Sequence, residues 1–171
     1  KEIVGRIEAK AKADEVPVST PADDAEFLRR VSLAFNGRIP ASDEAKAFLA
    51  DASPDKRAKL IDKLIGAPEY ASRMADLFHV MLMERLGDHP EWAKYLRESF
   101  AANKPWDVMA REILRADPKA PEATRGAAFF LARRLENYGQ NPVDYSGLTR
   151  DVGRLFLGKN FQCCECHDHL F

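Results

Sequence analysis

The most reactive side chains of this 171-residue sequence lie near its C-terminus, in the run Cys163-Cys164-Glu165-Cys166-His167. The run contains C-x-x-C-H, in which Cys163 and Cys166 occupy the thioether positions of a c-type haem and His167 that of the proximal iron ligand. On a helical turn, positions i, i+3 and i+4 share one face, so both sulfur atoms and the imidazole can reach one porphyrin. The spacing therefore predicts covalent attachment of haem c.

Two other kinds of site would use the same side chains. A C-x-x-C pair can act as a redox dithiol. A zinc or iron ion is the stronger alternative, with this candidate ligand set: Cys163, Cys166, His167 and His169. Structural zinc sites usually take their ligands from two separated segments, whereas these four lie within seven residues, and the adjacent Cys166 and His167 strain a tetrahedron. This crowding favours haem.

Two further residues of the cluster have weaker interpretations. Cys164 lies roughly 100° around a helix from Cys163 and cannot replace it as an anchor, so we expect it to be a small buried side chain. His169 lies two residues beyond His167 and points away from the same face. We expect it to orient Asp168 and the loop, with binding of a second metal ion as the alternative.

A sixth iron ligand would have to come from elsewhere in the chain. The other His and Met residues are His79, His89, Met74, Met81, Met83 and Met109. Of these, His79 and Met81 are the distal candidates, although packing in the core is the default expectation for Met81, as for Met74. If neither binds, the iron is five-coordinate and open to a small ligand, which favours a haem-dependent enzyme over electron transfer.

The elements that must position these residues are all helical. Apolar residues recur at helical spacing nearly throughout, and no segment alternates as a strand would. We predict an all-α fold, an irregular multi-helix bundle with a C-terminal CxxCH haem-attachment turn. Residues 1–19 are expected to form a leader helix or arm and residues 20–171 a cytochrome c-like domain. With their caps included, the expected helices span residues 2–13, 20–36, 42–50, 53–66, 68–87, 91–102, 105–116, 124–137 and 142–157.

Caps and stripes define these helices. We expect Thr20 to cap the second helix, which should stop at Gly37, and Ser42 to cap the third. The helix that begins at Pro68 should form the centre of the bundle. Its buried stripe is predicted to comprise Tyr70, Met74, Leu77, Phe78, Met81 and Leu82.

Composition excludes several classes of protein. The length suits one domain with a core that needs no disulfides. The 26 basic and 27 acidic residues are interleaved and give a net charge of −1, so nothing favours binding to nucleic acid. No apolar run approaches the roughly 20 residues of a membrane helix. Because reactive residues seldom occupy a frayed end, we expect the natural protein to continue past Phe171.

An ordered series of motifs resembles a known family. It comprises FLRRVSL (27–33), NGRIP (36–40), SPDKR (53–57), LIDKL (60–64), PEY (68–70), LFLG (155–158) and QCCECHDH (162–169). From about Ala25 onward the sequence resembles the planctomycete cytochrome c-like family, which is catalogued as a domain of unknown function. It differs from the family pattern at Leu170, where proline is usual, and at Cys164, where alanine is common.

The resemblance implies an exported protein of planctomycete-type bacteria, commonly part of a longer chain with a further C-terminal domain. Haem attachment needs reduced thiols and normally follows export, so the periplasm is the expected compartment. The expected work is one-electron transfer. Its partners would be other redox domains of the same chain or a periplasmic electron carrier.

Overall fold

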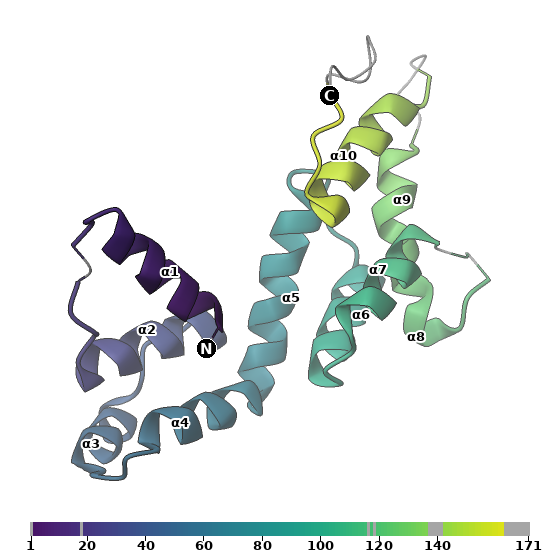
Figure 1. Cartoon of the computed structure of the whole chain (residues 1–171). Coiled ribbons are helices and arrows are strands. Elements are labelled where there is room, and N and C mark those ends of the chain that lie inside the picture. Colours follow the sequence, from purple (N-terminus) through teal and green to yellow (C-terminus); the bar gives the residue numbers. More distant parts are fainter. Residues whose placement is uncertain (1, 18, 116, 118, 137–141, 163–171) are drawn as a thin grey trace.

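The computed structural model describes residues 2–17, 19–115, 117, 119–136 and 142–162. Every regular element in these ranges is a helix, which confirms the all-α prediction for the described residues. Figure 1 shows helices α1 to α4 on one side of the long helix α5 and helices α6 to α10 on the other. Helix α5 therefore connects an N-terminal group of helices to a C-terminal group.

Helix α1 (Glu2–Ala13) agrees with the predicted leader helix and buries none of its residues. Its apolar side chains Ile3, Val4 and Ile7 are all exposed. The division of the chain into an arm over residues 1–19 and a domain over residues 20–171 stays a prediction.

Helix α2 (Asp24–Asn36) begins at a different cap from the one predicted. The N-cap is Asp23, whose carboxylate accepts a hydrogen bond of 2.8 Å from the backbone N–H of Glu26. The predicted cap at Thr20 is wrong because Asp23 satisfies the first-turn amides. The predicted stop is confirmed, since Gly37 adopts the left-handed conformation with φ +68°.

Helices α3 (Ser42–Ala50) and α4 (Lys56–Ile65) pack with α2. Ser42 is the first residue of α3 rather than its predicted cap, because Glu44 instead accepts a hydrogen bond of 2.7 Å from the backbone N–H of Ala41. Asp24 joins α2 to α4 through ion pairs of 2.7 Å with both Lys56 and Arg57. Hydrogen bonds from Lys56 and then Arg57 hold the pKa of Asp24 below its usual value.

Helix α5 (Pro68–Met83) contacts both groups of helices. In its first half, the Tyr70 ring packs edge-on against Phe35 of α2, with the ring centroids 5.9 Å apart. In its second half, Ala75 and Leu82 belong to the main core. The helix ends at Met83 and not at the predicted Gly87, because Glu84 turns the backbone to φ +52°.

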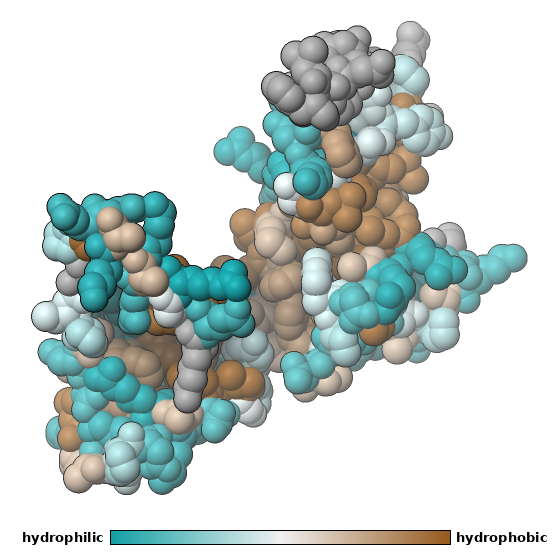
Figure 2. Space-filling view, viewed as in Figure 1, coloured by the Kyte–Doolittle hydropathy of each residue, from teal (hydrophilic) through white to brown (hydrophobic). Residues whose placement is uncertain are grey.

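The buried face of α5 also differs from the prediction. Leu77 and Met81, expected in the buried stripe, are 40% and 43% exposed, and Val80 between them is 64% exposed. Figure 2 shows apolar surface along this helix. The buried residues of the helix are Ala71, Ala75, Leu82 and Met83, so Leu82 is the one member of the predicted stripe that is fully buried.

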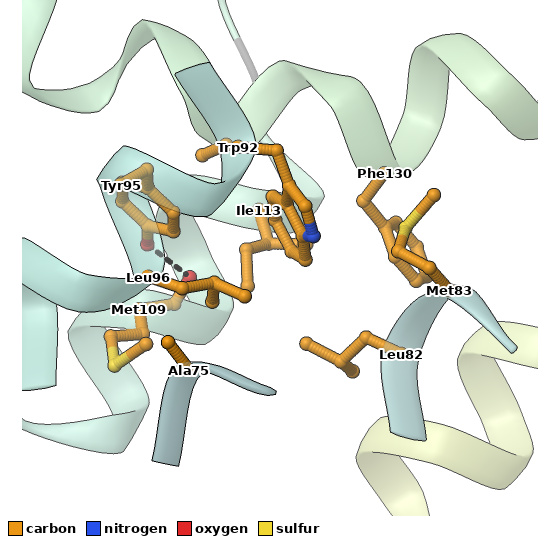
Figure 3. Packing of buried hydrophobic residues seen from close by; sticks show 10 residues of the cluster. Ala75, Leu82, Met83, Trp92, Tyr95, Leu96, Met109, Ile113 and Phe130 are labelled. Carbon is orange, nitrogen blue, oxygen red and sulfur yellow. Dashed lines mark hydrogen bonds between the residues drawn. The ribbon is translucent and has the colours of Figure 1, made fainter. Parts of the chain in front are cut away.

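The C-terminal group contains the main core (Figure 3). It is built from α6 (Pro90–Ala101), α7 (Trp106–Leu114), α8 (Glu122–Arg125), a 3-10 turn η1 (Gly126–Ala128), α9 (Phe129–Arg134) and α10 (Tyr145–Leu157). Its fully buried side chains include Trp92, Leu96, Ile113 and Phe130. Such close packing of large apolar side chains is the main source of stability in a domain of this size.

The single helix predicted over residues 124–137 is interrupted. Helices α8 and α9 are separated by the 3-10 turn that begins at Gly126. A Cβ atom on Gly126 would lie 2.1 Å from the carbonyl oxygen of Glu91 in α6. The backbones of the turn and of α6 can meet only because this residue is glycine.

Arg134 fastens three helices together. Its guanidinium, only 4% exposed, donates to the Leu82 carbonyl oxygen at the end of α5 (2.7 Å) and to the Asp151 carboxylate in α10 (2.8 Å). It also lies over the Phe130 ring, 3.9 Å from the centroid. The charge is therefore paired and hydrogen-bonded, as burial of a cation requires.

We predict that Arg134→Ala lowers the free energy of unfolding by about 3 kcal/mol, because it removes one partner of a buried ion pair and orphans the Leu82 carbonyl. Urea denaturation followed by circular dichroism measures the change. The control is Arg30→Ala, which removes an exposed pair with Glu26 and should cost no more than about 0.5 kcal/mol. Equal losses of unfolding free energy in the two variants would contradict the role of Arg134 in joining the three helices.

Candidate functional site

The predicted ligand cluster itself lies outside the described residues. This applies to Cys163, Cys166 and His167, to the low-ranked His169, and to Cys164. The structure does describe the segment that leads into the cluster and both candidate distal ligands, His79 and Met81.

The segment before Cys163 is turned back at the end of α10. Gly158 ends the helix in the left-handed conformation, with φ +61°, as predicted. The next residue, Lys159, donates its backbone N–H to the Gly153 carbonyl oxygen at 2.9 Å. The Asn160 side chain then accepts a hydrogen bond of 3.0 Å from the backbone N–H of Gln162. Figure 1 shows the chain running back beside α10 after this turn.

The returning segment packs against Gly153 of α10. It is buried, and a Cβ atom at its position would lie 2.4 Å from the Phe161 ring. The aromatic ring of Phe161 therefore packs directly on the backbone of α10. The role of Gly153 is not predicted by the sequence motifs above, although an isolated glycine inside an amphipathic helix often marks such a close contact.

Helix α10 is held on the core by aromatic contacts. Phe156 stacks on Trp106 of α7, with the ring centroids 5.7 Å apart and the planes 5° from parallel, and meets Phe130 edge-on at 5.4 Å. Trp106 in turn lies 5.3 Å from Phe78 of α5. The segment that leads to Cys163 thus rests on a helix fixed to both α5 and α7.

His79 has a structural partner. The buried Trp92 donates its indole N–H to His79 Nδ1 at 3.1 Å. A neutral imidazole carries one proton, so acceptance at Nδ1 places that proton on Nε2. In this arrangement neither ring nitrogen of His79 offers a free lone pair to a metal.

Met81 has a different environment. Its side chain is 43% exposed on the outer face of α5, between Leu77 and Val80, so the expectation of core packing is wrong for this residue. A thioether in this position is accessible to a metal ion. The apolar side chains beside it would favour an apolar macrocycle over water.

Tyr95, Lys104 and Glu112 form a hydrogen-bonded group within the fold. Tyr95 donates its hydroxyl to the Glu112 carboxylate at 2.8 Å, and Lys104 donates to the same carboxylate at 2.9 Å. Burial, and then the adjacent carboxylate, raise the pKa of Tyr95. Among the described residues, no three His, Cys, Asp or Glu side chains are close enough to hold a metal ion.

One family model matches the chain, over residues 2–171, and it describes PSCyt2, a protein of unknown function (DUF1549). The chain belongs to the PSCyt2 family. No curated protein and no solved structure matches it. The match takes in both groups of helices and the Cys/His cluster of this PSCyt2 chain. Over the residues that the structure describes, each helix is too short or too polar to cross a bilayer.

We predict that Gly153→Ala displaces the segment before Cys163, because the added methyl group would overlap the Phe161 ring. The free energy of unfolding should fall by about 1–3 kcal/mol, the usual cost of overpacking. Thermal unfolding followed by circular dichroism measures it. The control is Gly5→Ala in the exposed helix α1, where nothing lies within 4 Å of the added methyl group. A Gly153 variant as stable as this control would show that the contact does not hold the segment.

Proposed function

We propose that this PSCyt2 chain is a c-type haem domain that transfers single electrons within an exported protein. The observation that supports the proposal is the C-x-x-C-H sequence of residues 163–167. The short name of the family, which contains the abbreviation Cyt, agrees with it. The proposed compartment is the periplasm, because the attachment of haem to reduced thiols normally follows export.

The chemistry of the described residues is compatible with a haem. The proposed covalent anchors are Cys163 and Cys166, and the proposed proximal ligand is His167. For the distal position we favour Met81 over His79, because the thioether of Met81 is accessible whereas the His79 ring is engaged by Trp92. Leu77 and Val80 add exposed apolar surface next to this thioether.

A bound haem supplies the one-electron redox centre, and the chain supplies what holds and tunes it. A thioether in the distal position raises the reduction potential. The packing of Phe161 on Gly153 fixes where the anchoring segment leaves α10. The proposed partners are other redox domains of the same chain or a periplasmic electron carrier.

Attachment of haem is tested by producing the protein together with a haem-maturation system. We expect a pyridine haemochrome spectrum and an intact mass equal to polypeptide plus one haem. Cys163→Ala and Cys166→Ala should each remove one thioether and lower the yield of haem-bearing protein. Cys164→Ala is the matched control and should keep the full yield, because its side chain is not an anchor.

A colourless sample whose mass is that of the polypeptide alone would refute the proposal. If such a sample holds one equivalent of zinc and loses helicity on chelation, the zinc-binding module that uses Cys163, Cys166, His167 and His169 becomes the better interpretation. A haem-bearing sample that binds small ligands at the iron without displacing a protein side chain would favour the haem enzyme.

The distal ligand is tested on the haem-bearing protein. We predict that Met81→Ala lowers the reduction potential, because an axial thioether raises it. His79→Leu should leave the potential unchanged and instead lower the free energy of unfolding by about 1–3 kcal/mol, because the buried Trp92 N–H loses its acceptor. Leu77→Ala, on the same face as Met81, is the control for surface effects. A potential that responds to His79→Leu and not to Met81→Ala would reverse the assignment.

A further inference from the structure

A cavity of about 260 Å3 lies among α2, α3 and α4, remote in sequence from the Cys/His cluster. Each helix lines it with one stripe at helical spacing. Helix α2 contributes Leu28, Ser32 and Asn36, α3 with its C-cap contributes Glu44, Ala47, Phe48 and Asp51, and α4 contributes Lys56, Lys59, Leu60, Lys63 and Leu64. The cavity is thus formed by the faces of three helices and is not a gap left by a single small residue.

The floor of the cavity is apolar and well supported. Leu28, Phe48 and Leu64 line it and are themselves buried. The Phe48 ring stacks on the Phe27 ring, with the ring centroids 6.2 Å apart. The Lys56 ammonium lies 5.1 Å from the centroid of the Phe48 ring. A floor of this kind suits an alkyl chain and has no polar group to hold water.

The charges around the cavity leave one cation available. Arg38 holds Glu44 through two hydrogen bonds of 2.9 and 3.0 Å, Lys56 pairs with Asp24, and Lys59 pairs with Asp55. Lys63 has no ion-pair partner among the described residues, and its positive charge is felt across the cavity by Glu44.

Arg38, and not Lys63, is the hydrogen-bonded partner of Glu44. The hydrogen bonds from Arg38, then that from the backbone N–H of Ala41, lower the pKa of Glu44 to about 2. Its carboxylate therefore stays ionised and paired with Arg38 at neutral pH. The ammonium of Lys63 is left to attract an anionic group.

We propose that this cavity binds a small amphipathic organic anion, an aliphatic carboxylate. The tail lies on Leu28, Phe48 and Leu64, and the carboxylate faces Lys63. This site is separate from haem attachment, and either proposal can fail alone.

The probe is octanoate, titrated into the 171-residue protein by isothermal calorimetry. We expect saturable binding of one equivalent, and about tenfold weaker binding to Lys63→Glu, which corresponds to 1.4 kcal/mol. Lys46→Glu, the same change at an exposed position on α3 outside the cavity, should bind as the parent protein does. Octylamine, which has the same chain with the opposite charge, should not bind.

A second variant tests the cavity without changing charge. Ala47→Phe should fill the space and abolish binding, whereas Ala50→Phe, on the same helix outside the cavity, should retain it. Both variants should keep the parent's helical circular dichroism spectrum. No binding by the parent protein, equal binding by Ala47→Phe, equal binding by Lys63→Glu, or equal affinity for octylamine would each overturn the proposal.

Discussion

The arrangement of the C-terminal helices depends on the burial of one guanidinium group. Arg134 is withdrawn from water, and a buried cation is tolerated only where acceptors surround it. The end of α5 provides one through the Leu82 carbonyl, which has no partner within its own helix, and α10 provides another through Asp151. A cation at a helix C-terminus is also favoured by the helix dipole. The charge of Arg134 thus sets where α10 lies relative to α5.

The position of α10 in turn constrains the segment that carries the proposed haem. Phe156 fixes the inner face of α10 on Trp106 and Phe130, and Gly153 offers its bare backbone to Phe161. Four residues after Gly158 has ended the helix, the chain reaches Gln162, directly before Cys163. The contacts of Arg134, Phe156 and Gly153 together position the chain as far as Gln162.

The sequence was sufficient for the local features of this fold and insufficient for the contacts between distant segments. Helix class, the stops at Gly37 and Gly158, and the start at Pro68 follow from patterns within one or two turns, and they are confirmed. The cap at Asp23 was missed because several neighbouring residues are suitable caps and only the backbone geometry chooses among them.

The helix interruption at Gly126 and the close contact at Gly153 could not be predicted from the sequence, for another reason. Each depends on a backbone or ring brought close by tertiary packing, Glu91 in one case and Phe161 in the other. The exposed face of α5 was missed because its apolar residues surround much of the helix. Periodicity alone could not show that Ala71 and Ala75, rather than Leu77 and Met81, are buried.

The same contrast between local patterns and contacts of distant segments applies to the candidate site. The anchors of a c-type haem are contiguous, so a local pattern is enough to nominate Cys163, Cys166 and His167. A distal ligand would come from a residue far along the chain, and the hydrogen bond between Trp92 and His79 distinguishes His79 from Met81 in a way that no spacing could. In the proposed haem domain two thioether bonds would hold the macrocycle. The helices would then need to supply only one further side chain and an apolar surface.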